Sequence, residues 1–219
     1  MGIRASDWEQ VQTLLDQRRP ETMDLIKVNG IPFATVSGIG VGALLANEFN
    51  VRRVESSFFR TICRYLKSQV YTVLSAKAIL FQRSYLHDLH VKSDVFEERI
   101  RTGAMFICNQ NYLGGDLRVS SLSENDDQKF RVLIIPRTLS NELITALVQM
   151  KLGNIPSDFI LFSTDHLTIT EMRGRPIRLF GDGEILTEKS ELEFKIIPQG
   201  LKVYRDRSPQ VQTRKGRAS

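Results

Sequence analysis

The stretch Leu179-Phe180-Gly181-Asp182-Gly183-Glu184-Ile185 places two carboxylates on either side of a glycine, between apolar residues. An apolar run, an acidic glycine turn and a second β-like run, residues 192–197, are typical of a β-hairpin. This pattern predicts that Asp182 and Glu184 lie at the hairpin tip. Two such carboxylates can divide the work of a site, because one can hold Mg²⁺ or a ribose hydroxyl while the other accepts a proton. The alternative is a simple turn with Glu184 in solvent.

The composition indicates a globular body with a basic tail. The chain has 219 residues, 42% of them hydrophobic, which is enough to bury a substantial core. Residues 205–219 hold five arginine and lysine residues against Asp206, so the tail carries +4 of the formal charge of +5 and the body only +1. A nearly neutral body argues against a nucleic-acid-binding face. We expect the tail to be disordered, and either weakly attracted to anionic lipid headgroups or merely solubilising.

Two further features bear on the compartment. No apolar run approaches the length needed to span a bilayer, so any membrane contact should be peripheral. Cys63 and Cys108 are far apart, and no secretory signal precedes them. We therefore expect a cytoplasmic protein with reduced, buried thiols.

The first forty residues predict a helix and then a hairpin. Ser6-Asp7-Trp8-Glu9 has capping-box spacing, and the helix that it starts should stop before Pro20. Asn29-Gly30 separates the β-like runs 23–28 and 31–37, which is a strong signal for a hairpin with a type I′ turn. Pro32 suggests that the second strand is an edge strand.

The glycines that follow also match a different motif. Gly38, Gly40 and Ala43 fit the dinucleotide fingerprint G-x-G-x-x-A, in which a helix N-terminus approaches a pyrophosphate. That motif requires a strand-helix-strand unit with parallel strands, whereas the preceding strand here belongs to an antiparallel hairpin. A tight turn from strand to helix is the preferred interpretation.

The rest of the chain predicts an α+β fold, mostly an antiparallel β-sandwich with two or three flanking helices. Residues 54–82 lack proline and glycine and predict two consecutive helices. A third helix is expected from the N-cap Ser140 to Leu152, with Gly153 as its stop. The remaining segments are short and strand-like. The predicted strands are 86–92, 95–101, 104–109, 130–135, 159–163, 166–171, 177–180, 192–197 and 201–204.

The three histidines do not predict a metal site. His87 and His90 are three residues apart on a predicted strand, so their side chains should point to opposite faces. His166 stands apart from both. We expect all three to be satisfied or solvated.

Four segments together resemble the diacylglycerol kinase-like lipid kinases of bacteria, which are related to sphingosine and NAD kinases. The segments appear in the family's order and cover about Thr22 to Tyr204. They are Asp24-Leu25-Ile26-Lys27-Val28-Asn29-Gly30 with the glycine turn 38–40, Asn109-Gln110-Asn111-Tyr112-Leu113-Gly114-Gly115, Asp126-Asp127 before strand 130–135, and Asp182-Gly183-Glu184 with residues 192–203.

This resemblance implies that residues 1–204, with a helical insert at about 54–83, form the second, lipid-accepting lobe of such an enzyme. Asp182 and Glu184 are then the catalytic candidates: Glu184 as general base or nucleotide ligand, and Asp182 as the residue that orders Mg²⁺ or its water shell. Gly183, Asn109, Gly114 and Gly115 are implied to bind substrate or nucleotide. Asp127 is a candidate metal ligand. ATP is the implied co-substrate and Mg²⁺ the implied cofactor.

The family's phosphate-binding Gly-Gly-Asp-Gly-Thr loop is absent from the sequence. On this interpretation a nucleotide-binding lobe must come from elsewhere, and the chain alone should show negligible turnover. Sheet edges left open by the missing lobe would favour a homodimer. Two other hypotheses remain at this point: a non-catalytic lipid-binding or regulatory module of the same fold, and an NAD(P)-binding oxidoreductase using Gly38, Gly40 and Ala43.

Overall fold

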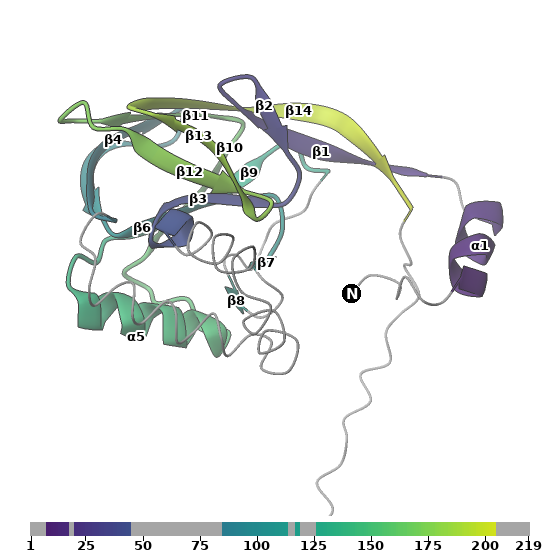
Figure 1. Ribbon diagram of the computed structural model, residues 1–219, viewed down its shortest axis with the longest axis horizontal. Helices are drawn as coiled ribbons and strands as arrows, with labels where there is room; N and C mark the ends of the chain where they lie inside the picture. The colour runs from purple at the N-terminus through teal and green to yellow at the C-terminus, as the bar shows by residue number, and fades with distance from the viewer. Residues whose placement is uncertain (1–7, 18–19, 45–84, 114–116, 119–125, 205–219) are drawn as a thin grey trace, which may run out of the picture.

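The computed structural model describes residues 8–17, 20–44, 85–113, 117–118 and 126–204, and the structural statements below concern these residues. Their main feature is a sandwich of two six-stranded sheets, with a helix lying outside one of them (Figure 1). Every strand pairing within the two sheets is antiparallel. The predicted α+β sandwich is therefore confirmed.

Sheet A is the outer, more solvent-exposed layer. In spatial order it contains β2 (Ile31–Phe33), β1 (Glu21–Val28), β14 (Glu191–Val203), β11 (His166–Glu171), β4 (His87–Ser93) and β5 (Glu97–Thr102). Along β4 the side chains alternate between buried and partly exposed, starting with buried His87. This period of two is expected of a strand with one face on the core and the other towards water.

Sheet B is the inner layer. It contains β10 (Ile160–Thr164), β9 (Phe130–Ile135), β6 (Ala104–Cys108), β3 (Val36–Gly40), β12 (Ile177–Gly181) and β13 (Glu184–Lys189). All residues of β3 and β6 are buried, because these central strands are covered on both faces. A separate pair, β7 (Tyr112–Leu113) and β8 (Leu117–Arg118), lies beside the sandwich.

Two apolar clusters hold the layers together. One fills the space between the sheets and includes Ile26, Leu89, Ile107, Leu167 and Phe194. The other lies on the far side of sheet B, where α5 (Ser140–Lys151) packs its buried Leu143 and Met150. Burial of large apolar side chains, at about 1.5–3 kcal/mol each, is the main stabilising term.

The N-terminal predictions are largely confirmed. Helix α1 (Trp8–Gln17) ends before Pro20, and its proposed Ser6 cap lies outside the described residues. Asn29 and Gly30 both have positive φ, at 45° and 94°, as the predicted type I′ turn requires. β2, which contains Pro32, is indeed an edge strand. The prediction of one strand over 31–37 is wrong: the chain breaks at residues 34–35 and passes from sheet A to sheet B.

Three other predictions about strand pairing and element bounds are wrong. The strand that pairs with β12 is β13, not residues 192–197, which lie in sheet A. Strands 192–197 and 201–204 are one strand, β14, interrupted only by an irregularity in its pairing with β1. The cap of α5 is Leu139 without a side-chain hydrogen bond, and Ser140 is its first residue; the Ser140 hydroxyl lies 3.2 Å from that of Tyr85. Gly153, at φ 86°, follows the helix end as predicted.

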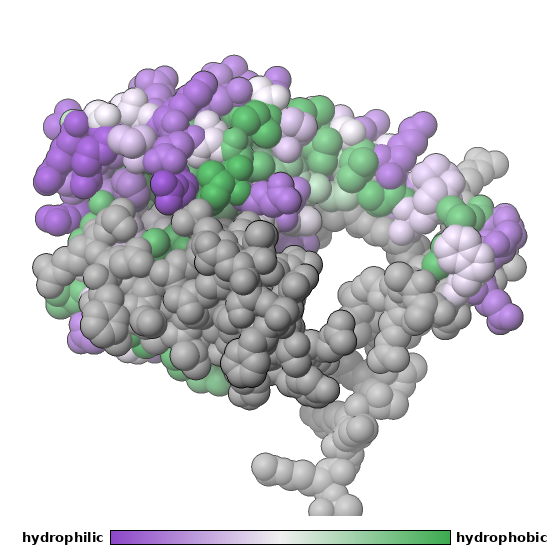
Figure 2. Space-filling model, viewed as in Figure 1, coloured by the Kyte–Doolittle hydropathy of each residue, from purple (hydrophilic) through white to green (hydrophobic). Residues whose placement is uncertain are grey.

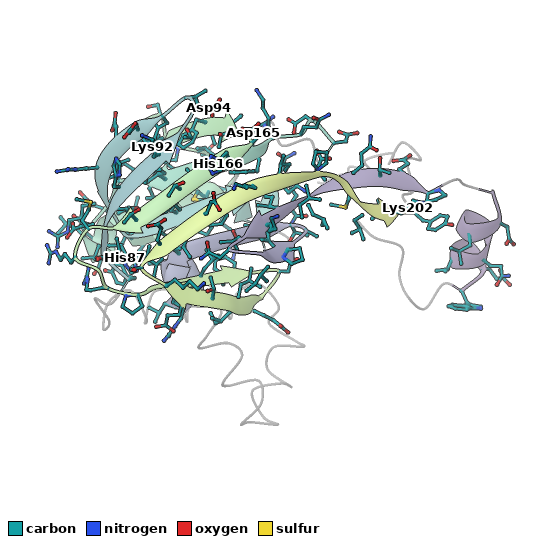
Figure 3. All side chains as sticks on the ribbon, turned by 90° about the horizontal axis from the view of Figure 1, so that it is seen from above. His87, Lys92, Asp94, Asp165, His166 and Lys202 are labelled. Atoms are coloured by element: carbon teal, nitrogen blue, oxygen red, sulfur yellow. The ribbon has the colours of Figure 1, made fainter. Side chains whose placement is uncertain are left out.

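Helix α1 stands away from the sandwich, beyond the end of the β1–β14 ribbon (Figures 1 and 3). Its Trp8 and Leu15 side chains are 70% and 52% exposed. On the face seen in Figure 2, most of the described surface is hydrophilic and a band of apolar residues crosses its centre. Within the described ranges, no helix combines the length and apolar character needed to cross a bilayer.

Several predictions fall on residues that the structure does not describe. These are the helices over 54–82, Cys63, Gly114, Gly115 and the tail 205–219. Cys108 is buried and unbridged, and burial raises the pKa of its thiol far above the usual value. It is therefore held in the unreactive thiol form.

Candidate functional site

The Asp-Gly-Glu segment forms the two-residue turn between β12 and β13. Asp182 and Gly183 have φ of 50° and 92°, and Gly181 pairs with Glu184 across the turn. Positive φ at both central positions defines a type I′ turn, where glycine and aspartate are favoured. The predicted hairpin tip is present, although its second strand is β13.

Asp182 is fixed to the short link between β2 and β3. Its Oδ2 accepts the Ala34 amide at 2.8 Å, while its Oδ1 accepts the Thr35 amide at 2.9 Å and the Thr35 hydroxyl at 2.6 Å. The Asp182 amide donates to the Val36 carbonyl. Of roughly four acceptor positions on a carboxylate, donors among the described residues therefore use three and leave one on Oδ2. Asp182 holds the turn in place and keeps the capacity to order one further donor, such as a metal-bound water.

Glu184 differs from Asp182 in having no fixed partner within the described part of the chain. Its side chain is exposed, and no ion pair or side-chain hydrogen bond joins it to the residues that the structure describes. It follows directly after a turn whose conformation Asp182 determines. A free carboxylate on a rigid turn can accept a proton or contribute one oxygen to a metal that is otherwise held by water and phosphate.

Asn109 is buried next to the β2–β3 link. It is 1% exposed, and its Nδ2 donates to the carbonyls of Asp24 and Ala34 at 2.7 and 3.2 Å. Its amide donates to the Thr35 carbonyl. Asn109 therefore braces the β2–β3 link from the side opposite Asp182, and the structure places it in the frame of the site.

Asp127 is engaged by its own turn. Its Oδ1 accepts the Lys129 amide at 3.1 Å, and its Oδ2 forms a 2.6 Å ion pair with Arg131. The backbone of Gln128, at φ 57°, completes the turn. The described residues contain no group of three or more histidine, cysteine, aspartate or glutamate side chains placed to hold a metal. Mg²⁺ bound mainly by ATP phosphates and water would not need such a group.

The glycine stretch serves packing around Phe180, which precedes the turn. A Cβ at Gly38 or Gly42 would lie 2.8 or 2.5 Å from Cε1 of Phe180, and one at Gly40 would lie 2.2 Å from the Gly103 carbonyl oxygen. β3 pairs antiparallel with β6 and β12, and helical residues begin at position 41. The parallel unit required by the dinucleotide fingerprint is absent from the described residues, so the turn interpretation is confirmed.

Sequence reasoning missed Asp24 and Thr35. The Asp24 carboxylate is 1% exposed and accepts the amides of Gln128 and Gln199 at 2.7 and 2.8 Å. A period-two pattern did contain the signal, because Asp24 shares its strand face with Ile26 and Val28. An acid on a core-facing position must be satisfied by hydrogen bonds. Thr35 gave no local signal.

A second cluster of charged groups, Glu171, Arg175 and Asp88, lies before β12 and around His87, which Figure 3 labels. Glu171, 2% exposed, accepts hydrogen bonds from the amides of Arg173 and Arg175 and from the Arg175 guanidinium. Burial raises the pKa of Glu171, but the Arg175 side chain and these amides outweigh it and lower the pKa. Burial, assisted by the Arg175 charge, lowers the pKa of His87. His87 and His90 point to opposite faces, as predicted.

Comparison with known proteins supports the fold. No protein-family model matches the sequence, and no curated protein matches it. Three solved structures from Bacillus anthracis are similar: two described as a "putative diacylglycerol kinase", with TM-scores of 0.65 and 0.61 at 12% and 15% identity, and one described as a diacylglycerol kinase, with a TM-score of 0.61 at 12% identity.

The matches cover 88–92% of this chain and 60–61% of the similar chains. The chain therefore spans about three fifths of the length of the structures that it resembles. At these identities the likeness concerns the arrangement of the backbone and not the chemistry of individual residues. The fold of this chain is that of diacylglycerol kinase-like structures.

Proposed function

We propose that this chain is the lipid-accepting lobe of a diacylglycerol kinase-like enzyme, which transfers the γ-phosphoryl group of ATP to a lipid hydroxyl. The fold supports this proposal. So does the length of the similar structures, which leaves about two fifths of each for a further part. On this proposal that part is a nucleotide-binding lobe, supplied by another segment or another chain.

The observation that carries the proposal is the contrast at the turn: Asp182 is fixed by three hydrogen bonds, and Glu184 beside it is exposed and has no fixed partner among the residues that the structure describes. Phosphoryl transfer depends on positioned charge more than on covalent chemistry. Glu184 would accept the proton of the lipid hydroxyl as the hydroxyl oxygen attacks phosphorus and the bond to ADP breaks. Closure of the second lobe would exclude water from around Glu184 and the reacting groups.

Mg²⁺, bound mainly through ATP phosphates and water, would neutralise charge on the transferring group. The free Glu184 oxygens and the remaining acceptor position on Asp182 Oδ2 are the groups of this chain that could contact the ion or its waters. The lipid would arrive from a membrane surface, to which the basic residues of the tail add attraction.

The test measures phosphate transfer from radiolabelled Mg-ATP to diacylglycerol in phosphatidylserine-containing vesicles. The chain is assayed alone and with a polypeptide that carries a Gly-Gly-Asp-Gly-Thr loop and is encoded beside it. We expect turnover only in the mixture. Glu184→Gln should lower kcat by at least about 100-fold. Glu188→Gln, also on β13 but paired with Arg178, is the matched control and should leave kcat unchanged.

Ordinary turnover by the chain alone would contradict the two-lobe proposal, and full activity of Glu184→Gln would contradict the role of Glu184. The second candidate is a non-catalytic lipid-binding module. It is favoured by the three hydrogen bonds from Ala34 and Thr35, which occupy most acceptor positions of Asp182 and serve to hold the turn. It predicts that the chain sediments with vesicles, that Glu184→Gln sediments equally well, and that no lobe confers turnover.

Self-association through sheet edges stays a prediction. Exposed Ile31 and Leu161 lie on the edge strands β2 and β10 and would contribute to such a contact. Sedimentation velocity at micromolar concentration would detect the expected dimer, and addition of the nucleotide-binding polypeptide would show whether it competes for the same edge.

A further inference from the structure

We infer that Asp24, acting through Asn109, is a positioning residue for the Asp182–Glu184 turn. The inference deepens the proposed function, and only its catalytic consequence rests on that proposal. It starts from an unusual group: a carboxylate in the core-facing row of β1 that accepts hydrogen bonds from two backbone amides and, within the described residues, pairs with no cation.

The two amides come from segments that need an external constraint. Gln128 and Gln199 have φ of 57° and 51°, in the left-handed region that glutamine adopts rarely. Gln199 lies in an irregularity where β14 gains residues: Met23 pairs with Leu201, but Leu25 pairs with Ile197. Asp24 Oδ1 accepts the Gln199 amide within this irregularity. Asp24 therefore holds both the acidic turn at 126–128 and the bulge of β14 in strained conformations.

The same residue is connected to the opposite side of the site. The Asp24 carbonyl accepts Asn109 Nδ2 at 2.7 Å, and Nδ2 also donates to the Ala34 carbonyl at 3.2 Å. The amides of Ala34 and Thr35 then donate to Asp182. The path runs from Asp24 to Asn109, to the β2–β3 link and to the Asp-Gly-Glu turn. The path joins three of the sequence segments that resemble the kinases, and the Asp24 bond to Gln128, next to Asp126-Asp127, connects it to the fourth.

In this arrangement, the loss of one hydrogen bond at Asp24 should weaken the bonds that fix Asp182. In Asp24→Asn one acceptor oxygen is replaced by an amide group that faces another donor, so one of the two strained segments loses its partner. β1 then shifts or becomes more mobile, and Asn109 no longer has a fixed Asp24 carbonyl to which it donates. Buried, mutually dependent hydrogen bonds respond together more than isolated ones do.

The experiment measures amide hydrogen exchange by NMR on the full chain. In Asp24→Asn we expect exchange at Gln128 and Gln199 to accelerate roughly tenfold, and at Ala34 and Thr35 severalfold. The Ile196 amide, which bonds to the Asp165 carbonyl outside this path, should keep its rate. Asp126→Asn is the matched control, because its exposed side chain lies in the same acidic turn. It should leave the exchange rates of all these amides unchanged.

Unchanged exchange at Ala34 and Thr35, or equal acceleration at all amides, would overturn the inference. If Asp24→Asn does not fold, Thr35→Val replaces it. That variant removes only the hydroxyl bond to Asp182, and by the reciprocity of coupling it should accelerate exchange at Gln128. No change at Gln128 would then count against the path.

The catalytic consequence has its own readout in the two-lobe assay. Asp24→Asn should lower kcat about tenfold with little change in KM for ATP, because a small displacement of the turn misplaces Glu184. In a Glu184→Gln background the same substitution should not lower kcat further. A purely structural defect would lower kcat in that background as well. If no lobe confers turnover, the proposed function fails while the exchange result still decides the path.

Discussion

Strand β12 has a carboxylate-anchored turn at each end, and the two turns are built in opposite ways. Before β12, Glu171 is bound by the amides and guanidinium of residues at most four positions away. After β12, Asp182 is bound by Ala34 and Thr35, 147–148 residues earlier in the chain. The first anchor is local and the second is formed only by the tertiary fold.

The two ends also differ in whether a carboxylate is left unpaired and able to bind another group. At the Glu171 end the acid is bound by a cation, and the neighbouring Asp88 pairs with Arg101 and Arg173. At the Asp182 end the anchor uses only uncharged donors, and Glu184 keeps its charge unpaired among the described residues. A closed turn of the first kind serves stability. An anchored turn with a free acid beside it is the arrangement that a catalytic site needs.

The largest effect on stability is expected from Glu171→Ala. It leaves the turn amides of Arg173 and Arg175 and the Arg175 guanidinium without the buried carboxylate that accepts from them, so the free energy of unfolding should fall by about 2 kcal/mol. Urea denaturation measures this change. Glu188→Ala, which breaks an exposed pair with Arg178, should cost under about 1 kcal/mol. Equal losses in the two variants would remove the distinction between a buried anchor and a surface pair.

The next effect is expected from Gly42→Ala, which acts on the Asp182 end. The new methyl group would lie 2.5 Å from Cε1 of Phe180 and 3.1 Å from Phe106, and such overpacking costs about 1–3 kcal/mol. Displacement of Phe180 should also shift the amide resonances of Ala34 and Thr35. Gly174→Ala in the Glu171 turn has no atom within 4 Å of its added methyl but retains the penalty of φ 70°. It should leave those resonances unchanged.

The same contrast explains which features the sequence could predict. The Asn29-Gly30 hairpin, the edge position of Pro32 and the bounds of β11 follow from local signals and are confirmed. The break at residues 34–35 was missed, because it depends on Asp182 from the other end of the chain. Turn-forming residues 198–200 predicted a break in β14, whereas the Asp24 carboxylate converts them into a bulge.

The candidate site was predictable to a similar degree. The position of Asp182 and Glu184 at a hairpin tip came from the turn pattern. The difference between their roles could not be predicted from that pattern. The amides that fix Asp182 belong to Ala34 and Thr35, and residue type does not indicate where a backbone amide will lie. Asn109, which the family resemblance implies to bind substrate or nucleotide, is 1% exposed and donates to the Asp24 and Ala34 carbonyls, and its binding role stays a prediction.

A smaller effect is expected from pH at the Glu171 end. The pKa of His87 is lowered from 6.5 by burial and then by the Arg175 charge, against the pull of Glu171 and Asp88. Below about pH 6.5 the unfolded chain therefore binds a proton that the folded chain resists, and stability falls as the pH falls. Glu171, with its pKa lowered from 4.5, adds a loss of the same sign at more acid pH.

His87→Gln removes the first of these two titrations. Urea midpoints measured between about pH 7 and pH 5 should then become nearly constant, while the decline below about pH 4.5 remains. A slope between pH 7 and 5 as steep as that of the unmodified chain would show that another group is responsible.

The smallest effect on stability is expected at Glu184, and the matched pair Asp182→Asn and Glu184→Gln tests the comparison most directly. Asp182→Asn replaces an acceptor oxygen with a donor that faces a backbone amide, so it should cost about 1–2 kcal/mol. Glu184→Gln disturbs no bond of the described residues and should change the free energy of unfolding by less than about 0.5 kcal/mol. Loss of transfer in Glu184→Gln at unchanged stability would separate chemistry from folding, whereas a Glu184→Gln chain as unstable as Asp182→Asn would show that Glu184, too, is part of the anchor.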